Sequence, residues 1–176
     1  MKTLIRVLLG LVALVVLMLA VTYIDGLTMP TNHSTTVSAT IPAPPDQVFA
    51  RITDVAHGNQ WRPAVKSVTV LPPVNGPQGP QAHWVEDLGH NQTMNFLATR
   101  TDTPTRRDVL LDVPGAAYGG TWIYQLSPGP TPNTTTLQIT ENGYINPPIY
   151  RFVMKHVIGM TYNLDTYEKD ITKSFQ

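Results

Sequence analysis

The N-terminus constrains this chain most, because a long apolar run there follows two basic residues. Lys2 and Arg6 precede Val7–Ile24 (VLLGLVALVVLMLAVTYI), which contains no charged side chain. At about 1.5 Å per residue, a helix of this length would span roughly 27 Å, close to the thickness of a bilayer core. Tyr23 suits the membrane–water interface. We therefore expect residues 1–24 to form a single transmembrane anchor.

A cleaved signal peptide is the alternative interpretation of this segment. Signal peptides also start with basic residues, but their apolar run is usually about 7–15 residues long and ends in an A-x-A-like site. The best candidate for such a site, Ala20-Val21-Thr22, is a poor match. In both cases the positive-inside rule places the N-terminus in the cytoplasm and the rest of the chain on the extracytoplasmic side, anchored or secreted.

Composition excludes several classes of protein. The chain has 12 basic and 12 acidic side chains, and without Lys2 and Arg6 the exported part keeps 10 and 12, a net charge of −2. That balance argues against a nucleic-acid partner, which needs a basic surface. There is no cysteine, so disulfides and thiolate chemistry are excluded. No G-x-S-x-G, H-E-x-x-H, P-loop or G-x-G-x-x-G motif occurs, and we expect neither a metal nor a cofactor.

Beyond a polar linker at residues 25–34, the pattern predicts one domain over residues 35–176. Thr35–Ile41 alternates as a half-buried strand does, and Pro44-Pro45-Asp46 then opens a short helix that ends near Asp54. Turn-rich stretches, including residues 72–80, separate the strands that follow. These further strands are expected at Val65–Leu71, Gln81–Leu88, Gln92–Arg100, Arg106–Val113, Thr121–Leu126 and Thr134–Ile145.

The C-terminal segment changes from the strand period to the helix period. Its apolar residues recur mostly every three or four positions, which predicts one long amphipathic helix from Pro147-Pro148 to the C-terminus, with a bend or close contact at Gly159. They are Ile149, Phe152, Val153, Val157, Met160, Leu164, Tyr167, Ile171 and Phe175. An antiparallel sheet with one apolar face needs a cover, and this helix is the only element long enough. A cavity between the two would hold the functional site.

Two stretches carry a family resemblance. Residues 41–71 contribute Pro45, Val48, Phe49, Asp54 and Trp61, and residues 140–156 contribute Glu141, Gly143, Pro147 and Arg151. In this pattern the chain resembles START-like, Bet v 1-type proteins, the group called polyketide cyclase/dehydrase and lipid-transport proteins. The resemblance implies an α+β helix-grip fold, in which a curved antiparallel sheet wraps around a long C-terminal helix and encloses a cavity for a hydrophobic ligand. It transfers no catalytic role to any residue.

Six residues are the expected ligand contacts. Trp122 and Tyr124 share one face of a strand, and an aromatic-lined concavity with a few polar groups is typical of a ligand pocket. Glu141 follows Leu137 and Ile139 on one strand face, so its carboxylate could hold a ligand hydroxyl or act as an acid or base. The set comprises Phe96, Trp122, Tyr124, Glu141, His156 and Met160.

Three further features have competing interpretations. His83, Glu86, Asp87 and His90 are metal-ligand residue types, but Trp84-Val85 and Gly89-His90-Asn91 favour a solvated hairpin. On this strand, Trp84 with Glu86 and Leu88, or His83 with Val85 and Asp87, could equally form the inner face. Arg106-Arg107 is interpreted as a solvated strand end.

The sequence therefore predicts a membrane-anchored binding protein for a small hydrophobic ligand, lipid-like or polyketide-like. Two alternatives remain open. One is a cyclase- or dehydratase-type enzyme in which Glu141 and His156 act as a cavity acid and base. The other is a protein-interaction module whose cavity is filled by its own side chains.

Overall fold

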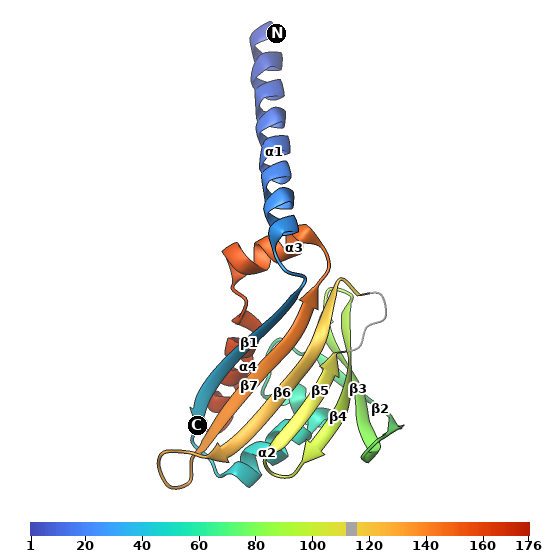
Figure 1. Cartoon of the computed structure of the whole chain (residues 1–176), viewed down its shortest axis with the longest axis vertical. Coiled ribbons are helices and arrows are strands. Elements are labelled where there is room, and N and C mark those ends of the chain that lie inside the picture. Colours follow the sequence, from blue (N-terminus) through green and yellow to red (C-terminus); the bar gives the residue numbers. More distant parts are fainter. Residues whose placement is uncertain (112–115) are drawn as a thin grey trace.

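A curved antiparallel sheet forms the centre of the computed structural model, which describes residues 1–111 and 116–176 (Figure 1). Its strand order is β1-β7-β6-β5-β4-β3-β2, so the N-terminal strand pairs with the last one and the others follow as neighbouring hairpins. The strands are β1 Asn32–Ile41, β2 Ser67–Gly76, β3 Gly79–Gly89, β4 Gln92–Asp102, β5 Arg106–Leu111, β6 Tyr118–Pro128 and β7 Thr135–Ile145. The predicted α+β helix-grip class is confirmed.

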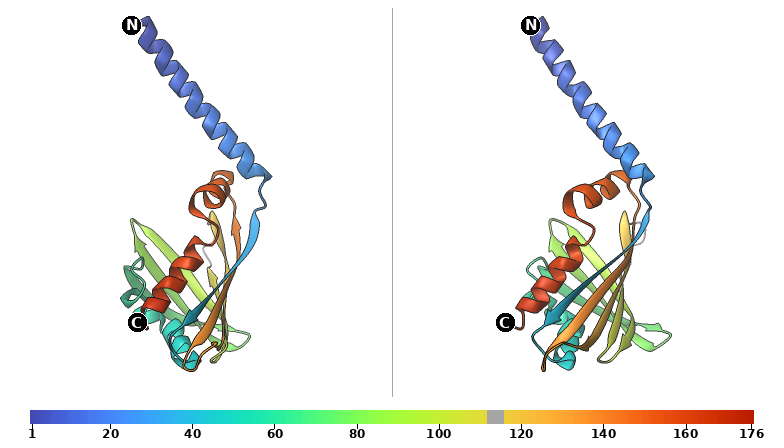
Figure 2. Two further views of the ribbon diagram at one scale, coloured as in Figure 1. Left: turned by 90° about the vertical axis from the view of Figure 1, so that its left-hand side faces the viewer. Right: turned by 60° about the vertical axis from the view of Figure 1, so that its left-hand side comes forward.

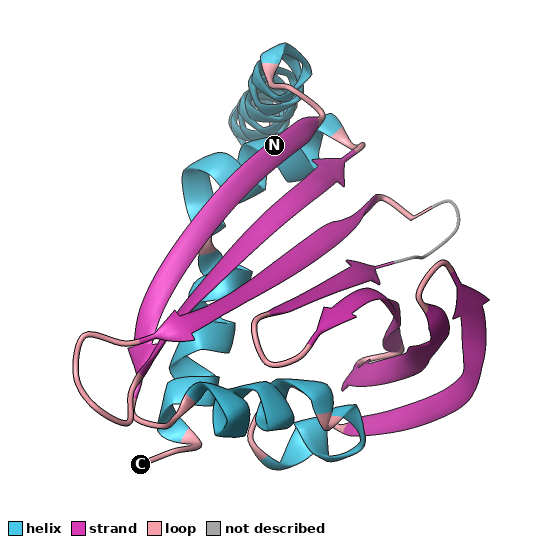
Figure 3. Ribbon diagram, turned by 60° about the horizontal axis from the view of Figure 1, so that its bottom comes forward, coloured by secondary structure: helices cyan, strands magenta, loops and turns pink. Residues whose placement is uncertain are grey.

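Helices cover one face of the sheet and close one end of it. α4 (Tyr162–Lys173) lies along the concave face, and the sheet curves around it (Figure 2). α2 (Pro45–Thr53) and the 3-10 turn η1 (Val55–Gln60) connect β1 to β2 across the end of the sheet (Figure 3). α2 begins at the predicted prolines because a proline in the first turn loses no intrahelical hydrogen bond.

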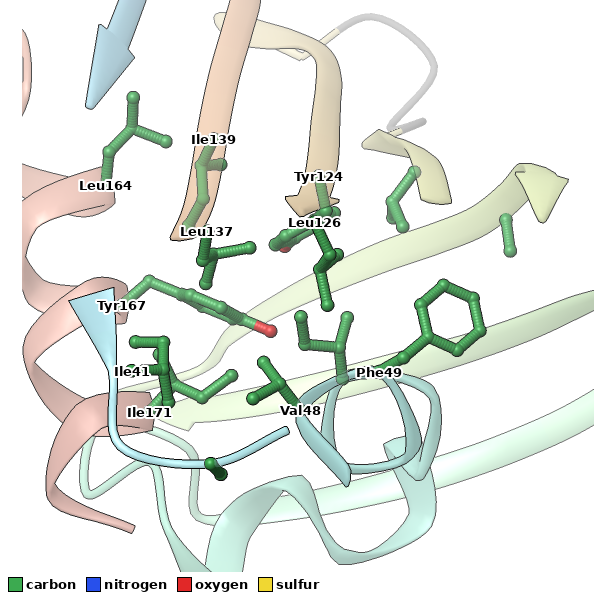
Figure 4. Packing of buried hydrophobic residues seen from close by; sticks show 14 of the residues in the cluster. Ile41, Val48, Phe49, Tyr124, Leu126, Leu137, Ile139, Leu164, Tyr167 and Ile171 are labelled. Carbon is green, nitrogen blue, oxygen red and sulfur yellow. The ribbon is translucent and has the colours of Figure 1, made fainter. Parts of the chain in front are cut away.

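The core fills the space between the sheet, α2 and α4 (Figure 4). β7 supplies Leu137 and Ile139, which have no exposed surface, while α4 supplies Leu164 and Ile171 at helical spacing. α2 adds its buried stripe of Val48, Phe49 and Ile52, as the sequence predicts. The apolar side chains that alternate along the strands and those that recur about every 3.6 residues along the helices thus pack together in one apolar layer.

The expectation of one long C-terminal helix is wrong. Its place is taken by α3 (Pro148–Val153), a π turn η2 (Met154–Ile158) and, after a break, α4. At the break, Gly159 has φ +103° and ψ 134°, a conformation that favours glycine. The bend expected at Gly159 is therefore present, but it separates two helices that point in different directions.

The end of the second strand also differs from the prediction. β2 continues through Pro72 and Pro73 to Gly76 with a register shift between Leu71 and Val74, so most of the expected turn at 72–80 is strand. β2 lies at the edge of the sheet, where a proline removes no ladder hydrogen bond that the sheet needs. Residues 112 and 113 of the expected strand Arg106–Val113 lie outside the described residues.

The N-terminal helix α1 (Lys2–Thr28) extends away from the sheet and is almost fully exposed (Figure 1). It includes an 18-residue window of mean hydropathy 2.9, enough by length and composition to cross a membrane. Because α1 ends at Thr28 and β1 begins at Asn32, most of the linker expected at 25–34 is regular structure.

The last turn of α1 is held against α3. Arg151 is buried and donates from Nε to the carbonyl of Gly26 (2.8 Å) and from Nη1 to the carbonyls of Ile145 and Asn146 (3.0 and 2.7 Å). Gly26 lies directly on the backbone of Pro148, where a Cβ would overlap the Pro148 carbonyl. α1 and α3 are therefore packed together through these contacts.

Replacing Gly26 with alanine should loosen this contact. Alanine normally stabilises a helix over glycine by about 1 kcal/mol, but here its methyl group must push α1 away from α3. We expect faster hydrogen–deuterium exchange over residues 148–158 in the Gly26→Ala chain, reconstituted in lipid nanodiscs. Gly10→Ala is the matched control, since nothing lies within 4 Å of its added Cβ. Equal exchange in both variants would contradict the packing described.

Candidate functional site

A cavity of about 260 Å³ lies between the concave face of the sheet and α4. Most of its wall is apolar or aromatic, which is typical of sites for small hydrophobic molecules. The aromatic residues on the wall are Trp61, Trp84, Phe96, Tyr118, Trp122, Tyr124, Tyr162 and Tyr167. They come from the segment after η1, from strands and from α4, so the site exists only in the folded domain.

Tyr167 of α4 is the centre of the aromatic wall. Its ring lies 5.3 Å from that of Trp61, 5.8 Å from Trp122 and 5.3 Å from Tyr124, mostly in edge-on or tilted geometry. Burial raises the pKa of Tyr167 to about 12, and burial likewise raises the pKa of Tyr124 well above its usual value. Both hydroxyls are therefore protonated at neutral pH and can donate hydrogen bonds.

A buried ion pair forms the first polar group of the cavity. Glu86, 3% exposed, accepts hydrogen bonds from both guanidinium Nη groups of Arg62 at 2.6 and 2.7 Å, and the indole Nε1 of Trp84 donates to it at 3.1 Å. Burial lowers the pKa of Arg62, but the hydrogen bond and charge of Glu86 outweigh this, and the pKa is raised overall. Both carboxylate oxygens of Glu86 are thus engaged within the protein.

Arg107 is the second buried guanidinium and is 2% exposed. Its Nη1 donates to the carbonyl of Ile52 at the end of α2 (2.7 Å), and its Cζ lies 5.3 Å from the centre of the Trp84 ring. Within residues 1–111 and 116–176 it has no carboxylate partner, and its Nε makes no hydrogen bond. Burial lowers the pKa of Arg107.

Glu141 lines the cavity from β7, two strands away from Arg107. Its carboxylate is 17% exposed and lies 3.9 Å from Nε2 of His33 on the neighbouring strand β1. In the register of the sheet it pairs with Trp122 of β6. The cavity wall thus carries the carboxylate of Glu141 two strands away from the guanidinium of Arg107, with the rings of Trp122 and Tyr124 on the strand between them.

The expected ligand contacts divide into two groups. Phe96, Trp122, Tyr124 and Glu141 are on the cavity wall. His156 and Met160 are not on it, because the break at Gly159 turns their segment away from the sheet. His156 instead places its Nε2 3.0 Å from Asp25 Oδ2 on α1. A cavity acid–base pair of Glu141 and His156 is therefore not formed.

The hairpin predicted for residues 83–90 is confirmed, since β3 ends at Gly89 and the turn residues His90 and Asn91 have positive φ. The expectation that its residues are solvated is wrong for Glu86, which is buried. The inner face is the one that carries Trp84, Glu86 and Leu88. The four metal-ligand types therefore alternate between faces. Across the described part of the chain, no three His, Cys, Asp or Glu residues are grouped to hold a metal ion.

The sequence did not predict Arg62 and Arg107 as cavity residues and left Glu86 open, as a member of one of two possible inner faces. For Arg107 the prediction of a solvated strand end is wrong: Arg106 is the partly exposed member of the pair and binds Asp108 (2.8 Å). The period of two was a usable signal, because it places Arg107 on the same strand face as the buried Val109. Arg62 gave no comparable signal, since it lies in an irregular turn.

Comparison with known protein families shows the family of this chain. Residues 32–163 match the family described as polyketide cyclase / dehydrase and lipid transport. The chain belongs to this family. Its fold and family membership support a START-like, polyketide cyclase-like ligand-binding domain, preceded by an apolar helix. No curated protein sequence gives a significant match.

Solved structures of the same fold are distant in sequence. A START superfamily protein from Mycobacterium smegmatis is similar with a TM-score of 0.60 and 16% identity, over 81% of this chain and 97% of its own. Norcoclaurine synthase from Thalictrum flavum gives 0.62 and 10%, over 86% and 90%. A protein from Thermus thermophilus gives 0.59 and 16%, over 80% and 95%. At these identities the similarity establishes the fold of this family member and nothing finer.

The Arg62–Glu86 pair gives a testable stability prediction. Glu86→Gln keeps the side-chain size but leaves Arg62 without a counter-charge in the cavity wall, which should cost about 3 kcal/mol of unfolding free energy. Urea titration of the full chain in detergent micelles measures it. Asp102→Asn, which breaks the exposed pair of Asp102 with Arg100, is the control and should leave stability nearly unchanged. Equal effects of the two changes would contradict a buried pair.

Proposed function

We propose that this protein binds a small hydrophobic molecule in the cavity between the sheet and α4. The observation that carries the proposal is the cavity itself, about 260 Å³ with a wall dominated by aromatic rings. Burial of apolar ligand surface contributes about 25 cal/mol per Å², and the buried hydroxyls and charges would orient the ligand. A space of this size also argues against a module whose core is completely filled.

We further propose that α1 anchors the domain in a membrane. The apolar run of α1 makes no buried contact with the domain, so its side chains need an apolar environment from outside the chain. Its last turn is packed on α3 through Gly26 and Arg151. The domain would therefore be held in a fixed orientation with α3 nearest to the bilayer.

A second exposed apolar surface supports this orientation. We define the α3–η2 patch as Ile149, Tyr150, Val157 and Ile158, which are 40, 51, 71 and 46% exposed. The patch belongs to the segment that packs on the end of α1, as Figures 1 and 2 both indicate. Tyrosine beside aliphatic side chains is typical of the membrane interface. The patch would lie in the headgroup region while the sheet extends into water.

Ligand binding can be tested with the full chain. Native mass spectrometry of the protein released from detergent micelles should detect a co-purified or added hydrophobic molecule at a one-to-one ratio. Met94→Trp places a larger side chain on the cavity wall and should weaken binding of added decanoate by about tenfold or more through overpacking. Val70→Trp, at a site on β2 that is 55% exposed, is the control. If neither variant changes binding, the ligand occupies another site.

The orientation can be tested by spin labelling, because the chain has no native cysteine. A label at Val157→Cys in lipid nanodiscs should collide more often with oxygen, which concentrates in lipid, than with a water-soluble nickel complex. A label at Val70→Cys should show the opposite preference. Nickel access at position 157 equal to that at position 70 would show that the α3–η2 patch faces water.

A further inference from the structure

Arg107 is a buried charge that the protein does not neutralise. Its guanidinium has five N–H donors, and only Nη1 has an acceptor among the described residues, the carbonyl of Ile52. Nε is fully buried without a hydrogen bond. A buried donor without an acceptor costs free energy, and a buried charge without a counter-charge costs more. The lowered pKa of Arg107 has this same cause.

None of the other charges on the cavity wall compensates Arg107. Glu86 is fully used by Arg62 and Trp84. Glu141 is two strands away, because Arg107 pairs with Tyr124 and Tyr124 with Ile139, two residues before Glu141 on β7. At about 4.8 Å per strand, this separation is roughly 10 Å before the offset along the strand is added.

The two remaining acidic groups on the wall are Asp54 and Asp170, and neither pairs with Arg107. Asp54 binds His57 at 2.8 Å. Asp170 is on α4, and its nearest basic neighbours are Arg62, Lys169 and Lys173. Around Trp84 the cavity wall therefore has two guanidinium groups, Arg62 and Arg107, against the single carboxylate of Glu86.

We infer that the ligand of this cavity is an amphiphile whose anionic head group, a carboxylate or a similar oxyanion, binds Arg107. This inference rests on the proposed ligand-binding function and specifies its substrate class. The planar guanidinium offers parallel donors that match a carboxylate. The aromatic rings of Trp122 and Tyr124 continue from this point toward Glu141 and would cover the apolar tail. The carboxylate of Glu141, two strands away, would repel the head group, so the ligand has one orientation.

The contact of Arg107 with Ile52 suggests a competing, purely structural role at the end of α2. The two roles differ in one observable. A structural role affects the binding of charged and neutral ligands alike, whereas a head-group role affects only the charged ligand. Decanoate and 1-decanol share one alkyl chain and differ in the charge, so the ratio of their affinities separates the two.

The experiment measures how each compound displaces the neutral dye N-phenyl-1-naphthylamine from the full chain in lipid nanodiscs, with empty nanodiscs subtracted. All three tryptophans line the cavity, so energy transfer from tryptophan reports dye held there. In the unmodified chain, decanoate should displace the dye at a concentration about tenfold below that of 1-decanol. This comparison of the two compounds uses only the unmodified chain.

In the Arg107→Met chain the preference for decanoate should disappear while the affinity for 1-decanol changes less than about twofold. Arg107→Lys should retain part of the preference. Arg106→Met is the matched control on the neighbouring, outward-facing position and should keep it fully. Equal affinities of the two compounds for the unmodified chain, or equal losses in Arg107→Met, would overturn the inference and leave the hydrophobic cavity intact. Failure of the dye and both compounds to bind the unmodified chain would refute the proposed function itself.

Discussion

The sheet must bury its concave apolar face, and α4 covers only part of it. Leu164 and Ile171 close the core against β7 and α2. On the N-terminal side of Gly159 the chain lies away from the sheet, so the covering helix is only Tyr162–Lys173. Beside Tyr167 of α4, the helix and the sheet do not fill the space between them. Aromatic rings line the cavity that remains there. On the far side of the break, α3 packs on α1 through Arg151 and Gly26. The break at Gly159 thus separates α4, which lines the cavity, from α3, which packs on α1.

Local periodicity was sufficient to predict the sheet and the start of α2. In a strand, alternating side chains such as Leu137 and Ile139 lie on the same face of the sheet. The helix α2 begins at Pro44-Pro45, as the two prolines predict. The end of the C-terminal helix was not predictable in the same way. The apolar spacing continues through Val157 and Met160, so Gly159 indicated a bend but not a full break, and the packing of α3 on α1 joins segments far apart in the sequence. β2 continued through Pro72-Pro73 because its edge position, a property of the whole sheet, tolerates proline.

The residues of the site were likewise predictable where a local pattern positions them and not where only the folded structure brings them together. Strand alternation put Trp122 and Tyr124 on one strand face and Glu141 on the face of Leu137 and Ile139, and the family resemblance implied the cavity. His156 was misplaced together with the helix that carries it. The buried charges were harder to predict because a charged residue is rarely buried without a partner. Glu86 and Arg62 are 24 positions apart and form their pair only in the folded domain. Arg107 lacks such a partner in the described chain, and this lack gives the cavity a chemical preference in addition to its apolar character.

A ligand bound in the space under Tyr167 would lie against the tryptophan indoles, which can therefore report its binding. Trp61, Trp84 and Trp122 border the cavity from the end of η1, from β3 and from β6, and they are the only tryptophans of the chain. Their indole N–H resonances can be followed by NMR while the full chain in lipid nanodiscs is titrated with decanoate. We expect all three indole resonances to shift together and to saturate with one dissociation constant for decanoate. Three unmoved resonances at decanoate concentrations that saturate the surrounding lipid would contradict this expectation.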